Sequence, residues 1–178
     1  LGCAPAMAFA NLYPNHTESL NLVWPVGGAR YRIRNFERFA VHLGWVAEHG
    51  LEALINRALD SNVGFAKDST LGPWGTSIRN DSELVNAIKS SNESAYNILV
   101  QASYRAMFNY DNALGPKPEE LMQINLPVCI VPGDDSSHAR SAAHFLDECI
   151  PRAQFLNLEV DAQNSDSVFA FFDGFYGH

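Results

Sequence analysis

The chain has 178 residues and a mass of 19.6 kDa, enough for one domain with a substantial core. Hydrophobic residues make up 47% and charged residues 18%, and the mean hydropathy is -0.13, which excludes a disordered tail and a membrane-embedded protein. Twenty acidic and twelve basic side chains give a formal net charge of -8, and such a surface repels phosphate backbones and anionic lipid. We therefore expect neither nucleic acid nor a membrane as a partner.

The first half of the chain predicts helices around one strand. Small apolar residues predict a buried helix over 4–12, and an alternating, then continuous apolar pattern predicts a strand over 19–26. Apolar residues at helical spacing over 35–60 predict two helices, with Gly50 between them as a C-cap. The stretch 63–76 is rich in glycine and predicts an irregular loop.

The second half predicts helices followed by alternating strands and helices. Asp81 is a good N-cap for a short helix that ends before Ser90. The next helix, over 93–108, is expected to place one set of apolar residues on a single face: Ala95, Ile98, Leu99, Ala102, Ala106 and Met107. The run 126–132 is β-branched and predicts a buried parallel strand. Three further elements are expected: a helix over 138–149, a strand over 155–160 and a helix over 165–175.

This order of elements predicts an α/β fold with a parallel sheet, because strands that alternate with helices pair through right-handed crossovers. Residues 1–28 and 118–178 are expected to form the core, with flanking helices, and residues 29–117 an all-helical cap. Sheets typically have about four to six strands, so three strands indicate that half of the sheet is missing.

Five segments, in this order, resemble the C-terminal portion of an α/β-hydrolase: 1–14 (LGCAPAMAFANLYP), 19–25 (SLNLVWP), 126–135 (LPVCIVPGDD), 151–155 (PRAQF) and the closing amphipathic helix. In that family a small-residue helix follows the nucleophile elbow G-x-S-x-G. The resemblance makes Gly2 the last glycine of the elbow and places the serine just before Leu1, outside this chain. It implies that the N-terminal half is a separate or removed segment.

The resemblance also implies roles for individual residues. The amide of Leu1 would belong to the oxyanion hole, because the family uses the residue after the nucleophile for this purpose. Asp135 takes the place of the carboxylate that orients the catalytic histidine, and Asp134 is a near-equal competitor. The alternative is that either carboxylate only caps the following helix.

The catalytic histidine departs from the family pattern. The family's Gly-His would fall near 160–163, where no histidine is present, and His178 comes after the final helix. His138, three residues beyond Asp135, is the candidate substitute for the general base, with helix-start packing as the alternative. Asp134, Asp135 and His138 also make a weak pattern for a metal site, and we expect neither a metal nor a cofactor.

Two more residues are candidates for substrate binding. Trp24 ends the first strand and is placed to form an apolar wall of an acyl or alcohol pocket, or else to pack under the cap. Arg30 belongs to a group of four arginines where the cap begins and is placed to hold a substrate carboxylate. A solvated loop or a salt-bridged hinge is the alternative for Arg30.

Three functions remain open from the sequence. The resemblance implies a serine-dependent hydrolase that acts on a small-molecule ester or related acyl substrate. The absent Gly-His is what a catalytically degenerate binding module predicts. A truncated fragment would expose the flank of its sheet and associate with itself, for example as a homodimer. The three cysteines form no C-x-x-C pair, and free thiols without a signal peptide indicate a cytoplasmic protein.

Overall fold

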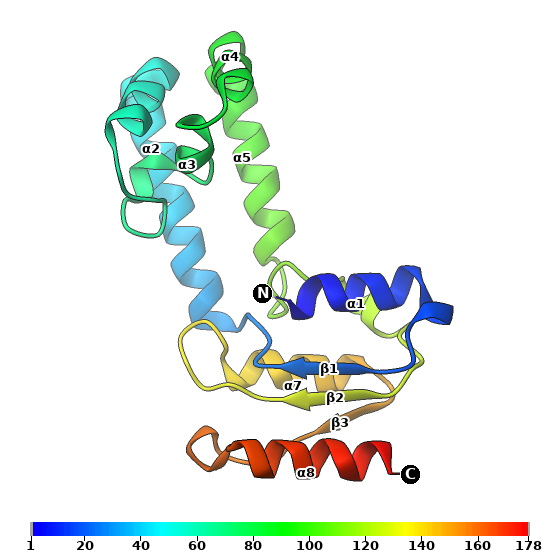
Figure 1. Ribbon diagram of the computed structural model, residues 1–178. Helices are drawn as coiled ribbons and strands as arrows, with labels where there is room; N and C mark the ends of the chain where they lie inside the picture. The colour runs from blue at the N-terminus through cyan, green and yellow to red at the C-terminus, as the bar shows by residue number, and fades with distance from the viewer. Residues whose placement is uncertain (1, 178) are drawn as a thin grey trace. The chain divides into compact units, whose positions relative to one another are not determined.

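The computed structural model describes residues 2–177 and shows a mixed α/β fold with a three-stranded parallel sheet (Figure 1). The chain divides into two compact units. The first, which we call the sheet unit, comprises Leu1–Ile33 and Met107–His178, and the second, the helical unit, comprises Arg34–Ala106. Among the described residues, no helix has both the length and the apolar character needed to cross a bilayer.

The sheet has the order β1-β2-β3, and both pairs of neighbours are parallel. The strands are β1 (Leu20–Val23), β2 (Val128–Val131) and β3 (Ala153–Phe155). All four residues of β2 are buried, which explains its continuous apolar run, because a central parallel strand is covered on both faces. The residues of β1 alternate between buried and exposed. The parallel sheet predicted from the sequence is confirmed at this level.

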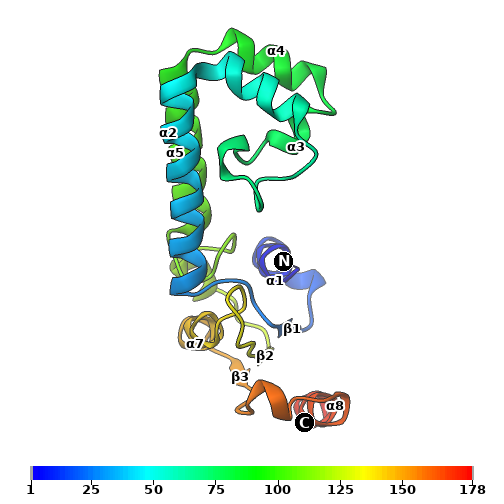
Figure 2. The same cartoon turned by 90° about the vertical axis from the view of Figure 1, so that its left-hand side faces the viewer.

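Helices cover both faces of this sheet. The helices of the sheet unit are α1 (Cys3–Leu12), α6 (Pro118–Leu121), α7 (Arg140–Cys149) and α8 (Ser165–Tyr176). Figures 1 and 2 show α1 and α7 on one side of the strands and α8 on the other. Met7 of α1 and Leu146 of α7 are fully buried and join Ile130 of β2 in the core of this unit. The core therefore lies mainly between the sheet and α1 with α7.

Two strands are shorter than the sequence predicted. The first was expected over 19–26 but ends at Val23, because Trp24 has a left-handed backbone with φ of 49°. The third was expected over 155–160 but ends at Phe155, and Val160–Ala162 is a short 3-10 turn, η3. The pairing of β2 with β3 ends at Ile130 and Phe155, and the amide of Leu156 makes one more hydrogen bond, to the carbonyl of Ile130. The apolar residues after Leu156 therefore have no strand to pair with.

The helical unit contains most of two long helices. They are α2 (Ala29–Asp60) and α5 (Glu93–Phe108), and the shorter helices are α3 (Gly75–Ile78) and α4 (Ser82–Ser90). Helix α2 is broken at Gly50, with φ of 81° and ψ of 172°, so the two predicted helices are confirmed. Its start at Ala29 is earlier than expected.

The buried face of α5 differs from the predicted one. Ile98 and Leu99 were expected on the packed face but are 69% and 56% exposed, whereas Tyr96 and Val100 are buried. Aromatic packing sets this orientation, because the ring of Tyr104 lies 5.2 Å from Phe36 of α2 and continues the face on which Tyr96 lies. The sequence pattern was wrong because it counted aliphatic side chains and left out tyrosine.

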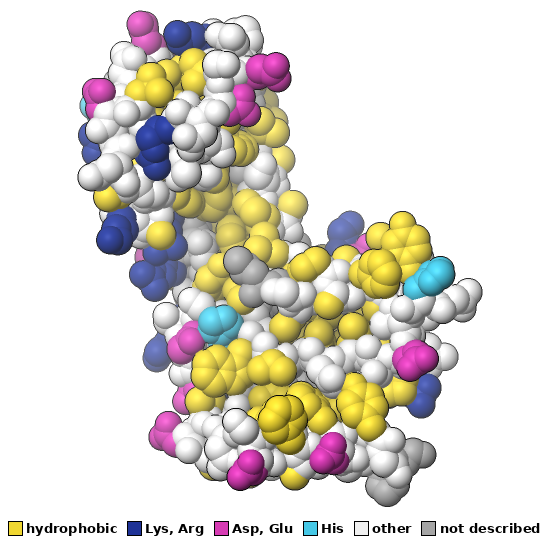
Figure 3. Space-filling model, viewed as in Figure 1, with side chains coloured by type: hydrophobic (Ala, Val, Ile, Leu, Met, Phe, Trp, Pro, Cys, Tyr) yellow, Lys and Arg dark blue, Asp and Glu magenta, His cyan; other side chains and the backbone are white. Residues whose placement is uncertain are grey.

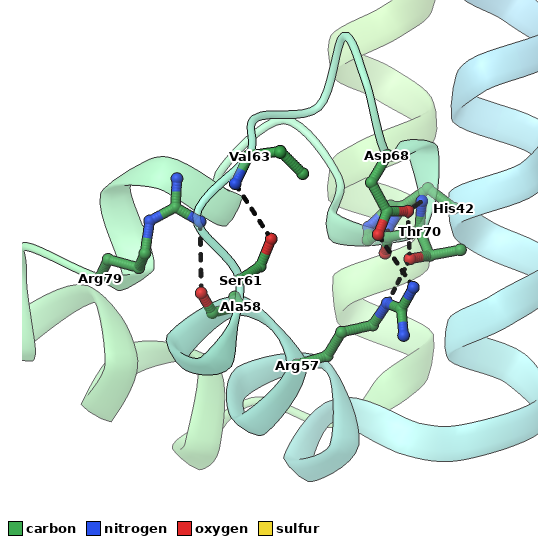
Figure 4. Close-up of polar contacts among 8 residues, drawn as sticks. All are labelled: His42, Arg57, Ala58, Ser61, Val63, Asp68, Thr70 and Arg79. Carbon is green, nitrogen blue, oxygen red and sulfur yellow. Dashed lines mark hydrogen bonds and ion pairs between the residues drawn. The ribbon is translucent and has the colours of Figure 1, made fainter.

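A polar network ties the loop after α2 to the helices (Figure 4). The carboxylate of Asp68 accepts bonds from the amide and the hydroxyl of Thr70, at 3.0 and 2.6 Å, and from Arg57 at 2.9 Å. Burial alone would raise the pKa of Asp68, but the hydrogen bonds from Thr70 and Arg57 outweigh it and lower that pKa. The loop contains a short turn, η2 (Ser69–Leu71), that presents the carbonyl of Thr70 to His42.

Candidate active site

The candidate site lies in the sheet unit, where β1 and β2 end at the same edge. Val23 and Val131 are paired in register, and the amide of Trp24 bonds to the carbonyl of Val131 at 2.8 Å. The loop that follows β2 runs from Pro132 to the start of α7 at Arg140. Ligands of open α/β folds bind outside the carboxyl ends of the strands, so both loops are at the usual position for a site.

Asp135 and His138 form a hydrogen-bonded pair in this loop. The two carboxylate oxygens lie 2.8 and 3.0 Å from Nδ1 of His138. One of them also accepts bonds from the amides of Ser137 at 2.7 Å and His138 at 2.8 Å. The local turn therefore fixes the carboxylate and imidazole together, and it is Asp135, not Asp134, that holds the histidine.

Gly133 makes this close turn possible. A Cβ atom at this position would lie 2.6 Å from the carbonyl oxygen of His138 and 2.7 Å from its Cβ. Any larger residue would push the histidine away from its position. The amide of Gly27 also bonds to the carbonyl of Ser137 at 2.9 Å, which links the turn to the segment that follows β1.

Hydrogen bonds favour the charged form of the Asp135 carboxylate. Two hydrogen bonds lower the pKa of Asp135: the larger effect comes from the His138 side chain and the next from the Ser137 amide. An ionised carboxylate can only accept a hydrogen bond, so it holds the N–H of the neutral imidazole on Nδ1 and leaves the lone pair on Nε2 of His138. Within residues 2–177 the structure gives that nitrogen no hydrogen-bond partner, and the side chain is 28% exposed. The arrangement can act as a general base.

Trp24 lies beside the imidazole, with the ring centroids 6.1 Å apart. Its indole nitrogen donates a bond to the side-chain oxygen of Gln163 at 3.0 Å, and the amide nitrogen of Gln163 donates to the carbonyl of Pro132 at 2.9 Å. The left-handed backbone of Trp24 is uncommon for a bulky residue and shows that surrounding contacts hold it. The indole is thus a fixed apolar wall next to His138.

Gln163 is the site residue that the sequence did not reveal. It follows η3, in the stretch where the family's Gly-His was expected, and it connects the ends of both strands through Trp24 and Pro132. A glutamine in a turn carries no distinctive signal. Only the three-dimensional contact with Trp24, 139 positions away along the chain, marks it.

The remaining predicted residues lie apart from this arrangement. Arg30 is exposed in the first turn of α2, and no contact within the described chain joins it to Asp135, His138 or Trp24. Arg32 is the bound arginine of this group: its guanidinium contacts the carbonyl of Phe108 and the carboxylate of Asp111, each at 2.9 Å. Leu1 lies outside the described residues.

Comparisons with known proteins find no matching family model, no similar curated protein and no similar solved structure. Within residues 2–177 no group of three or more His, Cys, Asp or Glu side chains is arranged to hold a metal ion.

Proposed function

We propose that this chain provides the general-base pair of an α/β-hydrolase-like enzyme that cleaves an ester or a related acyl substrate. The observation that carries the proposal is the 2.8 Å bond between Asp135 and Nδ1 of His138, with Nε2 unbound among the described residues. The position at the carboxyl ends of β1 and β2 supports it.

In the proposed reaction, Nε2 of His138 accepts the proton of an attacking hydroxyl as its oxygen bonds to the acyl carbon. The resemblance to α/β-hydrolases assigns that hydroxyl to a serine outside this sequence. The bond from the acyl carbon to the alcohol oxygen then breaks, and the departing alcohol takes the proton back from the imidazolium. Asp135 stabilises the imidazolium while it exists. Trp24 borders the acyl or alcohol group.

Two further groups are proposed from the sequence. The resemblance implies that the amide of Leu1 would donate to the developing oxyanion, and the group of arginines where the cap begins makes Arg30 a candidate to bind a carboxylate of the substrate. Both remain proposals on the strength of the sequence alone.

A catalytically degenerate binding module is the second candidate, and Gln163 favours it. The stretch in which the family's histidine was expected holds this glutamine, whose side chain is fully engaged by Trp24, Pro132 and Leu158. Such a bonded side chain stabilises the strand ends without contributing a base. This candidate predicts binding of a small apolar ligand without turnover.

The test is the hydrolysis of p-nitrophenyl butyrate by the natural full-length protein and its variants. His138→Gln removes the base and is expected to lower kcat/KM by roughly a hundredfold or more, and Asp135→Asn by about tenfold or more. His144→Gln, an exposed histidine on α7, and Asp134→Asn are the matched controls and are expected to keep the full rate.

A fluorophosphonate probe adds a second readout, because it labels an activated serine directly. Labelling that falls in His138→Gln and persists in His144→Gln supports the serine mechanism. Equal esterase rates in the two histidine variants would overturn the assignment of His138. Absence of turnover in the unmodified protein, combined with thermal stabilisation by butyrate esters, would replace the enzyme by the binding module.

A further inference from the structure

The helical unit contains a pocket that is separate from the Asp135–His138 site. It lies between α4 and α5 and has a volume of about 190 Å³. Its wall includes Trp74, Leu84, Ile88, Ala95, Tyr96 and Leu99. Ser91 and Asn92 connect the two helices, and Figure 2 shows α4 running across the end of α5. We propose that this pocket binds a small, uncharged aromatic molecule.

Small side chains in the wall leave this space open. Ala87 on α4 and Ala95 on α5 both line the pocket, and neither side chain can fill it. Helix caps hold the two helices in place: Asp81 accepts two amide bonds at the start of α4, and Asn92 accepts the amide of Ala95 at 2.8 Å. Both helices that line the pocket therefore begin at a capped residue, which stabilises their first turns.

The wall of the pocket is almost entirely carbon, and all of its lining residues are uncharged. Its two hydroxyl groups are already engaged, since Ser91 donates to the carbonyl of Ile88 at 2.8 Å and the Tyr96 hydroxyl bonds to Nε2 of His42, also at 2.8 Å. A charged ligand would lose its hydration without finding a partner, which excludes ions.

The floor of the pocket is rigid and neutral. Tyr96 is buried, and its partner His42 is fully buried and bonded on its other nitrogen to the carbonyl of Thr70 at 2.9 Å. Burial lowers the pKa of His42, so the imidazole beneath Tyr96 carries no charge at neutral pH. The binding surface is therefore formed before the ligand arrives, which limits the entropy cost of binding.

Aromatic walls specify the kind of apolar ligand. Trp74 and Tyr96 meet edge to face, with ring centroids 5.9 Å apart and an interplanar angle of 71°, and both line the pocket. A ring inserted beside them can adopt the offset or edge contacts that aromatic pairs favour. An apolar cavity of about 150 Å³ accommodates benzene, so this pocket fits a single ring or a small fused pair.

The probes for the test are benzene and indole, titrated against the full chain and followed by the NMR signal of the Trp74 indole N–H. The signal is expected to shift saturably, with a dissociation constant on the order of 1 mM for so few ligand atoms. Benzoate and benzylammonium, which add a charge to the same ring, are expected to bind at least tenfold more weakly.

Ala95→Phe fills the pocket and is expected to abolish the shift. Ala102→Phe is the matched control, because it makes the same exchange two turns further along α5, outside the pocket, at another exposed alanine. If Ala95→Phe does not fold, Ala87→Phe fills the pocket from the opposite wall. An unchanged titration in a folded pocket-filling variant, equal binding of the charged probes, or no binding of benzene or indole would overturn the proposal.

Discussion

His42 shows how one buried residue organises the helical unit. The carbonyl of Thr70 can only accept a hydrogen bond, so the proton of the neutral imidazole must be on Nδ1, and Nε2 must accept from the Tyr96 hydroxyl. Gly72 permits this packing: its φ is 67°, and a Cβ there would lie 2.3 Å from Cε1 of His42. One neutral imidazole thus joins α2, the loop after it and α5.

This arrangement predicts a pH-dependent stability. In the unfolded chain His42 titrates near its ordinary value of 6.5, whereas burial lowers its pKa in the folded chain. The free energy of unfolding is therefore not reduced by His42 above pH 6.5. It decreases as the pH falls from 6.5 toward the lower pKa of His42 in the folded chain, because in this range only the unfolded state binds the proton. Urea unfolding curves at pH 7.5 and 5.5 measure the decrease.

His42→Asn is expected to remove most of this decrease, whatever its effect on the absolute stability. His49→Asn is the control, since His49 is an exposed residue on the same helix. If the His42 variant keeps the same difference in unfolding free energy between the two pH values as the unmodified chain, another group is responsible.

At the scale of the element, the stability of α4 depends on its N-cap residue, Asp81. The carboxylate of Asp81 accepts bonds from the amides of Glu83 and Leu84 at 2.9 and 3.0 Å, and these amides have no partner within the helix. Asp81→Ala is expected to lower the unfolding free energy by about 1 kcal/mol. Asp81→Asn keeps a side-chain oxygen that can cap the helix and should lower the unfolding free energy by only a small part of this amount.

Thermal or urea unfolding of the two variants gives the comparison. An equal loss in both would show that the charge of Asp81, and not its hydrogen bonds, stabilises the helix. The same cap holds one side of the α4–α5 pocket, so Asp81→Ala should also weaken the binding of benzene.

The elements that the sequence predicted well are those set by local rules. Asp81 and Gly50 mark the start of α4 and the break in α2 because capping and backbone freedom depend on a few neighbouring residues. The buried face of α5 and the end of β3 were mispredicted, since each depends on a partner far along the chain. Ile98 is apolar, yet it is exposed because Tyr104 determines how the helix packs.

In the candidate site, too, contacts between residues close in sequence could be predicted, whereas contacts between distant residues could not. Asp135 and His138 are three residues apart, so a single turn brings them together and their proximity could be predicted from the sequence. Trp24 could be placed at a strand end, but not beside Gln163, because that contact requires the sheet to form first. Catalytic chemistry at the pair stays a prediction.

At the scale of the whole molecule, β1 forms an open edge of the sheet. Within the described residues it pairs only with β2, and Val23 at its end is 47% exposed. Figure 3 shows apolar side chains gathered on this face of the sheet unit. Trp24, which directly follows β1, is 38% exposed. An unpaired edge with apolar neighbours is a template for pairing with another strand.

We therefore expect this chain, expressed as residues 1–178, to associate with itself as its concentration rises. Sedimentation velocity should show a larger species that Val23→Lys strongly reduces, because a lysine at a sheet edge opposes pairing. Val41→Lys is the matched control on α2, where the valine is 52% exposed, and it should leave association unchanged. A monomer at every concentration would contradict this expectation.

The contacts that join residues on either side of the segment 34–106 have a consequence for the order of folding. Arg32 bonds to Phe108 and Asp111, and Gly28 to the carbonyl of Asp111, so the two ends of the intervening segment are fastened together inside the sheet unit. Strands β1 and β2 can pair only after that long segment has returned, and closing a long flexible loop costs entropy. Helices made of local contacts form quickly, so a segment that folds first shortens the effective loop and lets the parallel strands meet sooner.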